Sequence, residues 1–129
     1  MKPDPQLFNL ITQACTSYES IIAAYVFGSQ ATKRARPTSD VDIALLLEPG
    51  KEQEFDYLGF KDVDLVILNN AGEPIKNQVR RDGKLAFDRD PSQRKQWEMM
   101  SRKYYQDFLH LHSIYMQSLK KSLRSSPHG

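Results

Sequence analysis

Two aspartates separated by one residue, Asp40 and Asp42, open an apolar run. On a strand they would share a face about 7 Å apart, so that both carboxylates could bind one or two hard cations such as Mg²⁺. Ten residues separate this pair from Gly28 and Ser29, which precede it in the chain. Gly28 leaves room for a phosphate, and Ser29 offers a hydroxyl where a following helix would point free backbone N–H groups at an anion. The pattern predicts a nucleotide site with bound magnesium.

A third carboxylate would complete a two-metal site, and the next apolar run supplies Asp62 and Asp64. We favour Asp64 because it lies inside the run, where an aspartate without a partner is costly, whereas Asp62 stands at the entrance of the run. Such a site would position the α-phosphorus of a nucleotide, offset the triphosphate charge and help deprotonate an attacking hydroxyl, with pyrophosphate leaving.

The elements that must position these residues follow from the hydrophobic pattern. Apolar runs predict strands at residues 21–27, 41–47, 63–68 and 85–87. Periodic or short polar segments predict helices at residues 5–19, 29–36 and 73–81, and a long amphipathic helix at 91–124. The expected fold class is α/β (α+β), as one domain over residues 1–129 with its core at 5–90 and the last helix packed on that core.

Composition excludes several function classes. The 129 residues are 40% apolar and 26% charged with a net charge of +2, so that no global basic field favours nucleic acid, and direct nucleic-acid binding is not expected. One cysteine allows no intramolecular disulfide and no thiolate zinc site, which fits a reducing cytoplasm. No run approaches the roughly 20 apolar residues of a membrane span, and the first ten residues do not resemble a signal peptide. We therefore expect a mature cytoplasmic protein that does not bind membranes.

Gly28-Ser29, ten residues and Asp40-Val41-Asp42, with the run around Asp64, resemble nucleotidyltransferases of the DNA-polymerase-β type. More closely, they are similar to the minimal nucleotidyltransferases of MntA-type antitoxins, which are paired with HEPN-domain toxins in type VII toxin-antitoxin systems. The resemblance implies a small mixed sheet flanked by helices. It also implies AMP transfer from ATP to a tyrosine of a HEPN ribonuclease within a hetero-oligomeric complex, which silences the toxin.

By position, the resemblance assigns the nucleotide phosphates to Gly28 and Ser29. It assigns two Mg²⁺ ions and catalysis to Asp40, Asp42 and Asp64, with Asp64 as candidate base. Lys33 stands where many relatives have glycine. Because the core leaves only one further helix, we expect another protein to supply the acceptor.

Two alternatives stay open at this stage. One is a binding module that neutralises a toxin by covering it, and the other is an enzyme that nucleotidylates a small molecule such as an aminoglycoside. Arg80 and Arg81 could contact triphosphate or partner, although exposed basic residues usually serve solubility. The aromatic stripe from Trp97 to Tyr115 is expected to pack on the core, with Tyr104 or Tyr105 as the better candidates for partner contact.

Overall fold

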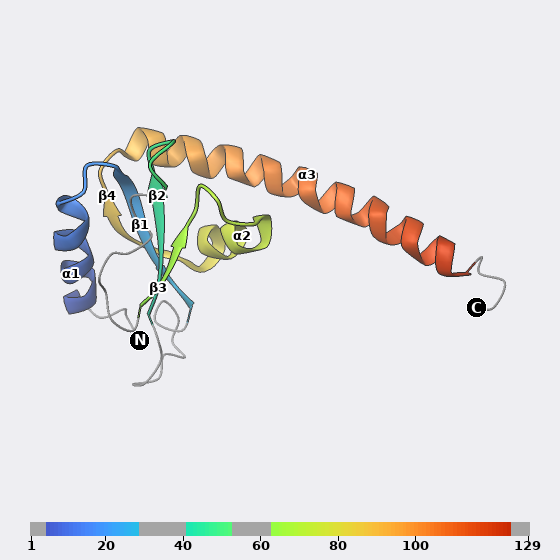
Figure 1. Ribbon diagram of the computed structural model, residues 1–129, viewed down its shortest axis with the longest axis horizontal. Coiled ribbons are helices and arrows are strands. Elements are labelled where there is room, and N and C mark those ends of the chain that lie inside the picture. The colour runs from blue at the N-terminus through green and yellow to red at the C-terminus, as the bar shows by residue number, and fades with distance from the viewer. Residues whose placement is uncertain (1–4, 29–40, 53–62, 125–129) are drawn as a thin grey trace.

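The computed structural model describes residues 5–28, 41–52 and 63–124 (Figure 1). Within these ranges the elements are α1 (Pro5–Thr16), β1 (Ile21–Phe27), β2 (Val41–Leu47), β3 (Val63–Ile67), α2 (Glu73–Asp82), β4 (Lys84–Asp88) and α3 (Pro91–Arg124). The predicted strands and the two later helices are confirmed to within one or two residues. The first helix ends three residues earlier than expected, and the short helix predicted at 29–36 lies outside the described residues.

The four strands form one mixed sheet in the order β3-β2-β1-β4. β1 pairs antiparallel with both β2 and β4, and β2 pairs parallel with β3. All seven residues of β1 are buried, because this strand has a neighbour on each side and helices on both faces. Such a strand reads as a continuous apolar run in the sequence, which is why residues 21–27 could be assigned without alternation.

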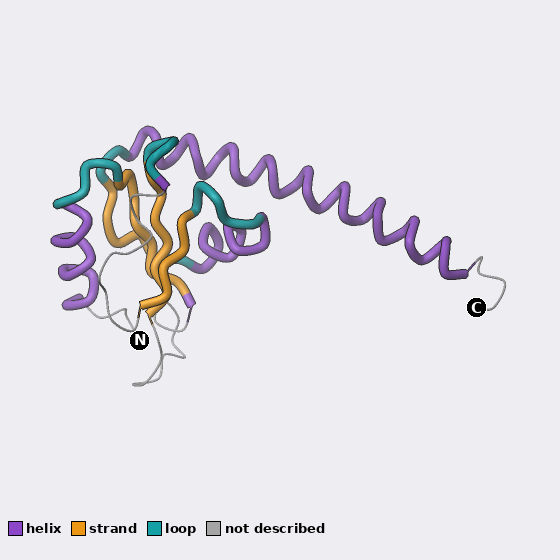
Figure 2. Tube along the Cα trace, in the orientation of Figure 1, coloured by secondary structure: helices purple, strands orange, loops and turns teal. Residues whose placement is uncertain are grey.

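The helices cover the two faces of the sheet unequally (Figure 2). On one face, Ile11 and Cys15 of α1 pack against Val26, Ile43 and Leu45. The other face packs against Val79 of α2 and Trp97 of α3, and its strand residues are Ile22, Ala23, Tyr25, Phe27, Ala44 and Leu46. A register shift between Ile21 and Ala23 places two successive residues, Ile22 and Ala23, on this second face.

A polar network fixes the start of α3 to the sheet. The Tyr25 hydroxyl donates to Glu98 Oε1 at 2.7 Å, and Arg94 forms ion pairs with Asp88 at 2.9 Å and with Glu98 at 3.0 Å. Burial and the neighbouring Glu98 raise the pKa of Tyr25 above its usual range, so that the hydroxyl stays a donor. The network joins β1, β4 and α3 where the helix begins.

Only the first half of α3 packs on the core, which corrects the expectation that the whole helix does so. Ser101 is the one buried residue of α3 among its described positions, and every residue from Leu109 to Arg124 is exposed. The helix continues past the end of the sheet into solvent (Figure 1). An apolar stripe shows which side of a helix is covered, but it carries no information about whether the same chain does the covering.

None of the helices described here has the length and apolar character needed to cross a membrane.

Candidate active site

The candidate site begins where β1 ends. Phe27, the last residue of β1, pairs with Asp42 of β2, so that Gly28 emerges beside the Asp42 side chain. Gly28 has φ of +77°, and a Cβ atom at this position would collide with the Asp42 carboxylate. Glycine is therefore required here for two reasons: it tolerates positive φ, and it lets the carboxylate lie against the backbone.

The register of the parallel pair places the second aspartate next to the first. Asp42 of β2 is the direct partner of Asp64 of β3. Neighbouring strands lie about 4.8 Å apart, so these two residues sit side by side at the same level of the sheet. Asp42 and Asp64 each stand two residues before a residue, Ala44 or Val66, that packs with α2 and α3. Residues two apart on a strand share a face, so the two carboxylates lie on the face that these helices cover.

The structure corrects the reason given for Asp64. We expected burial in an apolar run to force a partner on this carboxylate, yet the Asp64 side chain is exposed and Asp42 is half-buried. β3 is an edge strand and Asp64 lies near its start, so that solvent reaches the side chain. The pairing with Asp42, not burial, is what singles out Asp64.

Part of the predicted set lies outside the described residues. Ser29 and Asp40 fall there, as does Asp62, the alternative to Asp64. Within the residues that the structure does describe, no three His, Cys, Asp or Glu side chains form a metal-binding group. The described part of the site is thus Gly28, Asp42 and Asp64.

The chemistry of this donor set fits magnesium. Mg²⁺ prefers oxygen ligands, is held by one or two protein carboxylates and takes its remaining ligands from phosphates and water. Two carboxylates from neighbouring strands, beside a glycine that keeps the backbone uncovered, suit a metal bound together with a nucleotide.

The pattern that describes the polymerase beta nucleotidyltransferase family matches residues 9–92, which include the sheet and the candidate site. The chain belongs to this family. A search of curated protein sequences finds no significant match to this nucleotidyltransferase.

Solved structures with similar folds come from toxin-antitoxin pairs. A toxin-antitoxin structure with AMP-PNP is 22% identical, with a TM-score of 0.70 over 88% of this chain and 98% of the other. A structure of a tri-AMPylated Shewanella oneidensis HEPN toxin in complex with MNT antitoxin is 23% identical, with a TM-score of 0.65 over 89% of this chain and 98% of the other. A MntA-HepT structure gives the same identity, TM-score and coverage. These likenesses establish that the nucleotidyltransferase shares its fold with chains from such complexes.

The sequence did not indicate a role for Arg102. Arg80 and Arg81 at the end of α2 were candidates, but Arg102 of α3 joins them in lining a cavity of about 240 Å³, together with Tyr105. The sequence separates Arg102 from Arg81 by twenty residues, so that only the packing of α2 on α3 reveals the cluster.

Proposed function

We propose that this nucleotidyltransferase is an antitoxin that transfers AMP from ATP to a tyrosine hydroxyl of a cognate HEPN ribonuclease toxin and thereby inactivates it. The observation that carries the proposal is the juxtaposition of Asp42 and Asp64 in the β2–β3 register, beside the positive-φ Gly28. The family membership supports nucleotidyl transfer. The likeness to chains from complexes of AMPylated HEPN toxin and MNT antitoxin supports the acceptor.

In this reaction the tyrosine oxygen attacks the α-phosphorus of ATP in line with the leaving group. A bond forms between that oxygen and the α-phosphorus, the bond from the α-phosphorus to the bridging oxygen of the β-phosphate breaks, and pyrophosphate leaves. Asp64, which is exposed at the edge of the sheet, accepts the tyrosine proton. Gly28 and Ser29 hold the phosphates, and Gly28 does so by leaving its backbone uncovered.

Two Mg²⁺ ions would be held by Asp40, Asp42 and Asp64, and when bound they supply charge neutralisation for the triphosphate. Asp42 is fixed for this role by its two strand neighbours, Phe27 and Asp64. The fixed geometry matters because most of the catalytic gain in phosphoryl-type transfer comes from positioning and electrostatic stabilisation. We place the reaction in the cytoplasm.

The test is the intact mass of a cognate HEPN protein after incubation with the chain, ATP and Mg²⁺. We expect mass gains in whole AMP units, and we expect none with Asp40→Asn plus Asp42→Asn. If the HEPN protein gains no mass although both forms bind it tightly and neutralise it, the chain is a binding module. If the chain instead transfers AMP to a small molecule when no partner protein is present, the acceptor is misassigned.

A further inference from the structure

The second half of α3 carries an exposed apolar face. Leu111, Tyr115, Met116, Leu119 and Leu123 recur at the spacing of one helix side, and each side chain is 37–65% exposed. We call these five residues the distal face. The segment from residue 109 to 124 extends about 24 Å at 1.5 Å per residue, so that the distal face is long enough to contact a second helix or domain.

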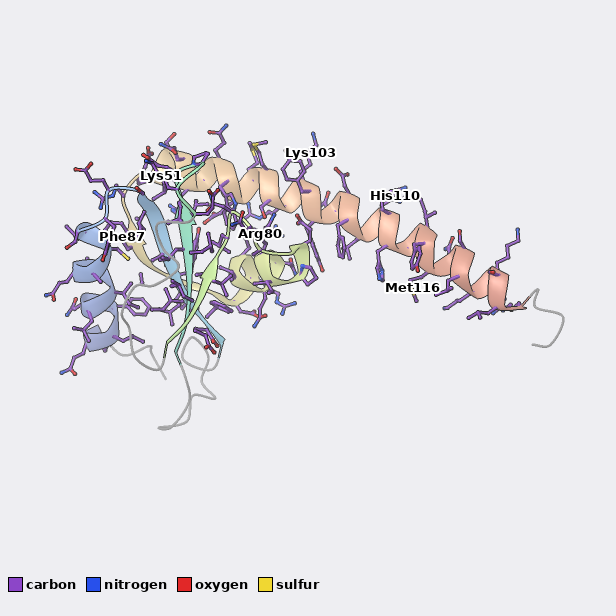
Figure 3. All side chains as sticks on the ribbon, viewed as in Figure 1. Lys51, Arg80, Phe87, Lys103, His110 and Met116 are labelled. Carbon is purple, nitrogen blue, oxygen red and sulfur yellow. The ribbon has the colours of Figure 1, made fainter. Side chains whose placement is uncertain are left out.

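The distal face continues the line along which α3 packs on its own core. Trp97, Ser101 and Phe108 are at least half-buried, and Tyr115 and Leu119 follow at helical intervals of seven and four residues. Figure 3 shows Met116 on the side of α3 toward which α2 and Arg80 lie, whereas Lys103 projects from the opposite side. The distal face therefore borders the angle between the projecting helix and the body of the protein.

The arginine cavity lies at the inner corner of that angle. Arg80, Arg81 and Arg102 line it, and the Arg80 guanidinium stands over the Tyr105 ring at 5.6 Å. The Nε and Nη2 atoms of Arg80 are buried and have no hydrogen-bond partner among the described residues. Burial and the nearby Arg102 both lower the pKa of Arg80, so that an incoming carboxylate would relieve an unfavourable concentration of positive charge.

Charge indicates what covers the distal face. From residue 102 to 124, α3 carries five Lys or Arg residues and one acidic residue, whereas the whole chain has a net charge of only +2. Pairing of two such helices from two copies would bring like charges together and is disfavoured. A partner surface with apolar side chains surrounded by acidic ones would pack against the distal face and pair with the arginines.

The location also suits the proposed chemistry. Ala44, Leu46 and Val66 share one face of the sheet with Asp42 and Asp64, and α2 and α3 pack against that same face. A partner seated between the projecting helix and α2 thus lies on the side of the sheet toward which the two carboxylates point.

We propose that the distal face and the Arg80–Arg81–Arg102 cavity together form the docking surface for the protein that receives AMP, and that the partner contributes apolar side chains flanked by carboxylates. The assignment of the partner as the HEPN toxin rests on the proposed function. The docking surface itself rests on the exposed stripe, the arginine cluster and the charge of α3.

The test measures binding without chemistry. The HEPN protein used in the AMP-transfer test is immobilised, and dissociation constants are measured in the absence of ATP. Tyr115→Glu with Leu119→Glu alters the distal face, and Ser113→Glu with Gln117→Glu adds the same charge to the opposite side of the helix. Arg102→Glu and Lys103→Glu form a second matched pair, because only Arg102 lines the cavity.

We expect the distal-face pair to weaken binding by roughly 30-fold or more, as for buried interface anchors, and Arg102→Glu by about tenfold. Ser113→Glu with Gln117→Glu and Lys103→Glu should change binding less than about threefold. Tyr115→Ala with Leu119→Ala, which keeps good helix formers, should weaken binding by about tenfold and guards against loss of helix in the glutamate variant.

The proposal would be overturned if the distal-face variants bound the HEPN protein as tightly as the wild type does. It would also be overturned if the control variants lost as much affinity as the distal-face variants. Sedimentation of the chain alone gives a separate check. We expect a monomer, and a dimer that Leu119→Glu dissociates would assign the distal face to a second copy instead. Face-dependent binding without AMP transfer would refute the transferase and leave the docking surface standing, whereas AMP transfer and binding that are both insensitive to the distal face would refute only the docking surface.

Discussion

Two regions on the same side of the sheet differ in how they are held. The site at the end of β1 is fixed by backbone pairing, which sets Asp42 between Phe27 and Asp64. The side chains of the distal face of α3 are exposed, on a helix segment that extends away from the sheet. The first region fits a role in which small displacements matter, and the second fits a surface that acquires its packing from another molecule.

The difference predicts opposite sensitivities. At the candidate site, an isosteric substitution such as Asp→Asn should strongly lower the rate of AMP transfer. The same substitution should have little effect on stability or partner binding. The distal face should tolerate such changes and respond only when apolar area or charge is altered.

Asp42→Asn should have the largest effect, because it removes one negative charge from a position set by two strands. We expect AMP transfer to fall on the order of 10³-fold, at the upper end for loss of one electrostatic contact in an active site. The dissociation constant for the HEPN partner should stay within about threefold of the wild-type value. A parallel loss of binding would show that the two regions are not separable.

Trp97→Ala and Leu119→Ala compare the two halves of α3. Trp97 packs against Tyr25, with ring centroids 6.3 Å apart, so we expect its loss to lower the free energy of unfolding by about 3 kcal/mol. Leu119 is exposed in the isolated chain, so its truncation should change that free energy by less than about 0.5 kcal/mol. Denaturant unfolding measures both, and equal losses would mean that the distal half is folded onto the body of the isolated chain.

Gly28→Ala and Gly50→Ala separate backbone strain from contact with the site. Both glycines have positive φ, so each substitution should cost about 1 kcal/mol of stability from backbone strain alone. Only at Gly28 would the new Cβ meet Asp42, since nothing lies within 4 Å of a Cβ at Gly50. AMP transfer should therefore fall at least tenfold with Gly28→Ala and stay unchanged with Gly50→Ala. Equal activities would remove Gly28 from the site.

Cys15, on the side of α1 that packs against the sheet, should give the smallest effect and lies away from both regions. Burial raises the pKa of its thiol from about 9 to about 11. Below pH 9 the Cys15 thiol is protonated in both the folded and the unfolded chain, and folding stability is unaffected. Above pH 9 the thiol ionises more readily in the unfolded chain, so the free energy of unfolding falls as pH rises toward 11, by up to about 1 kcal/mol at pH 10. Unfolding of wild type and Cys15→Ala between pH 7 and 10 measures this difference, and identical pH profiles would contradict it.

Much of the fold follows from local sequence patterns. Strands β1 and β2 are apolar runs bounded by polar or glycine residues, and the positions of Asp42 and Asp64 within their strands could be read directly. Their pairing could not be read, because it depends on the parallel register of β2 and β3, which no local pattern encodes.

The exposure of Asp64 and the free half of α3 were missed for related reasons. Edge strands and central strands can have the same composition, and a helix stripe looks the same whether it packs on its own core or on a partner. The Arg102 contribution to the cavity was missed because it requires two helices to meet. The roles of all five predicted site residues stay predictions, and two of them, Ser29 and Asp40, lie outside the described residues.

The most direct measurement is the initial rate of AMP transfer to the HEPN partner by Asp64→Asn compared with Asp62→Asn. Both substitutions remove one carboxylate from the same short segment, but only Asp64 pairs with Asp42. We predict a loss of roughly 100-fold or more for Asp64→Asn and a change of less than about threefold for Asp62→Asn. A loss confined to Asp62→Asn, or full activity in both variants, would contradict a site built on the Asp42–Asp64 pair.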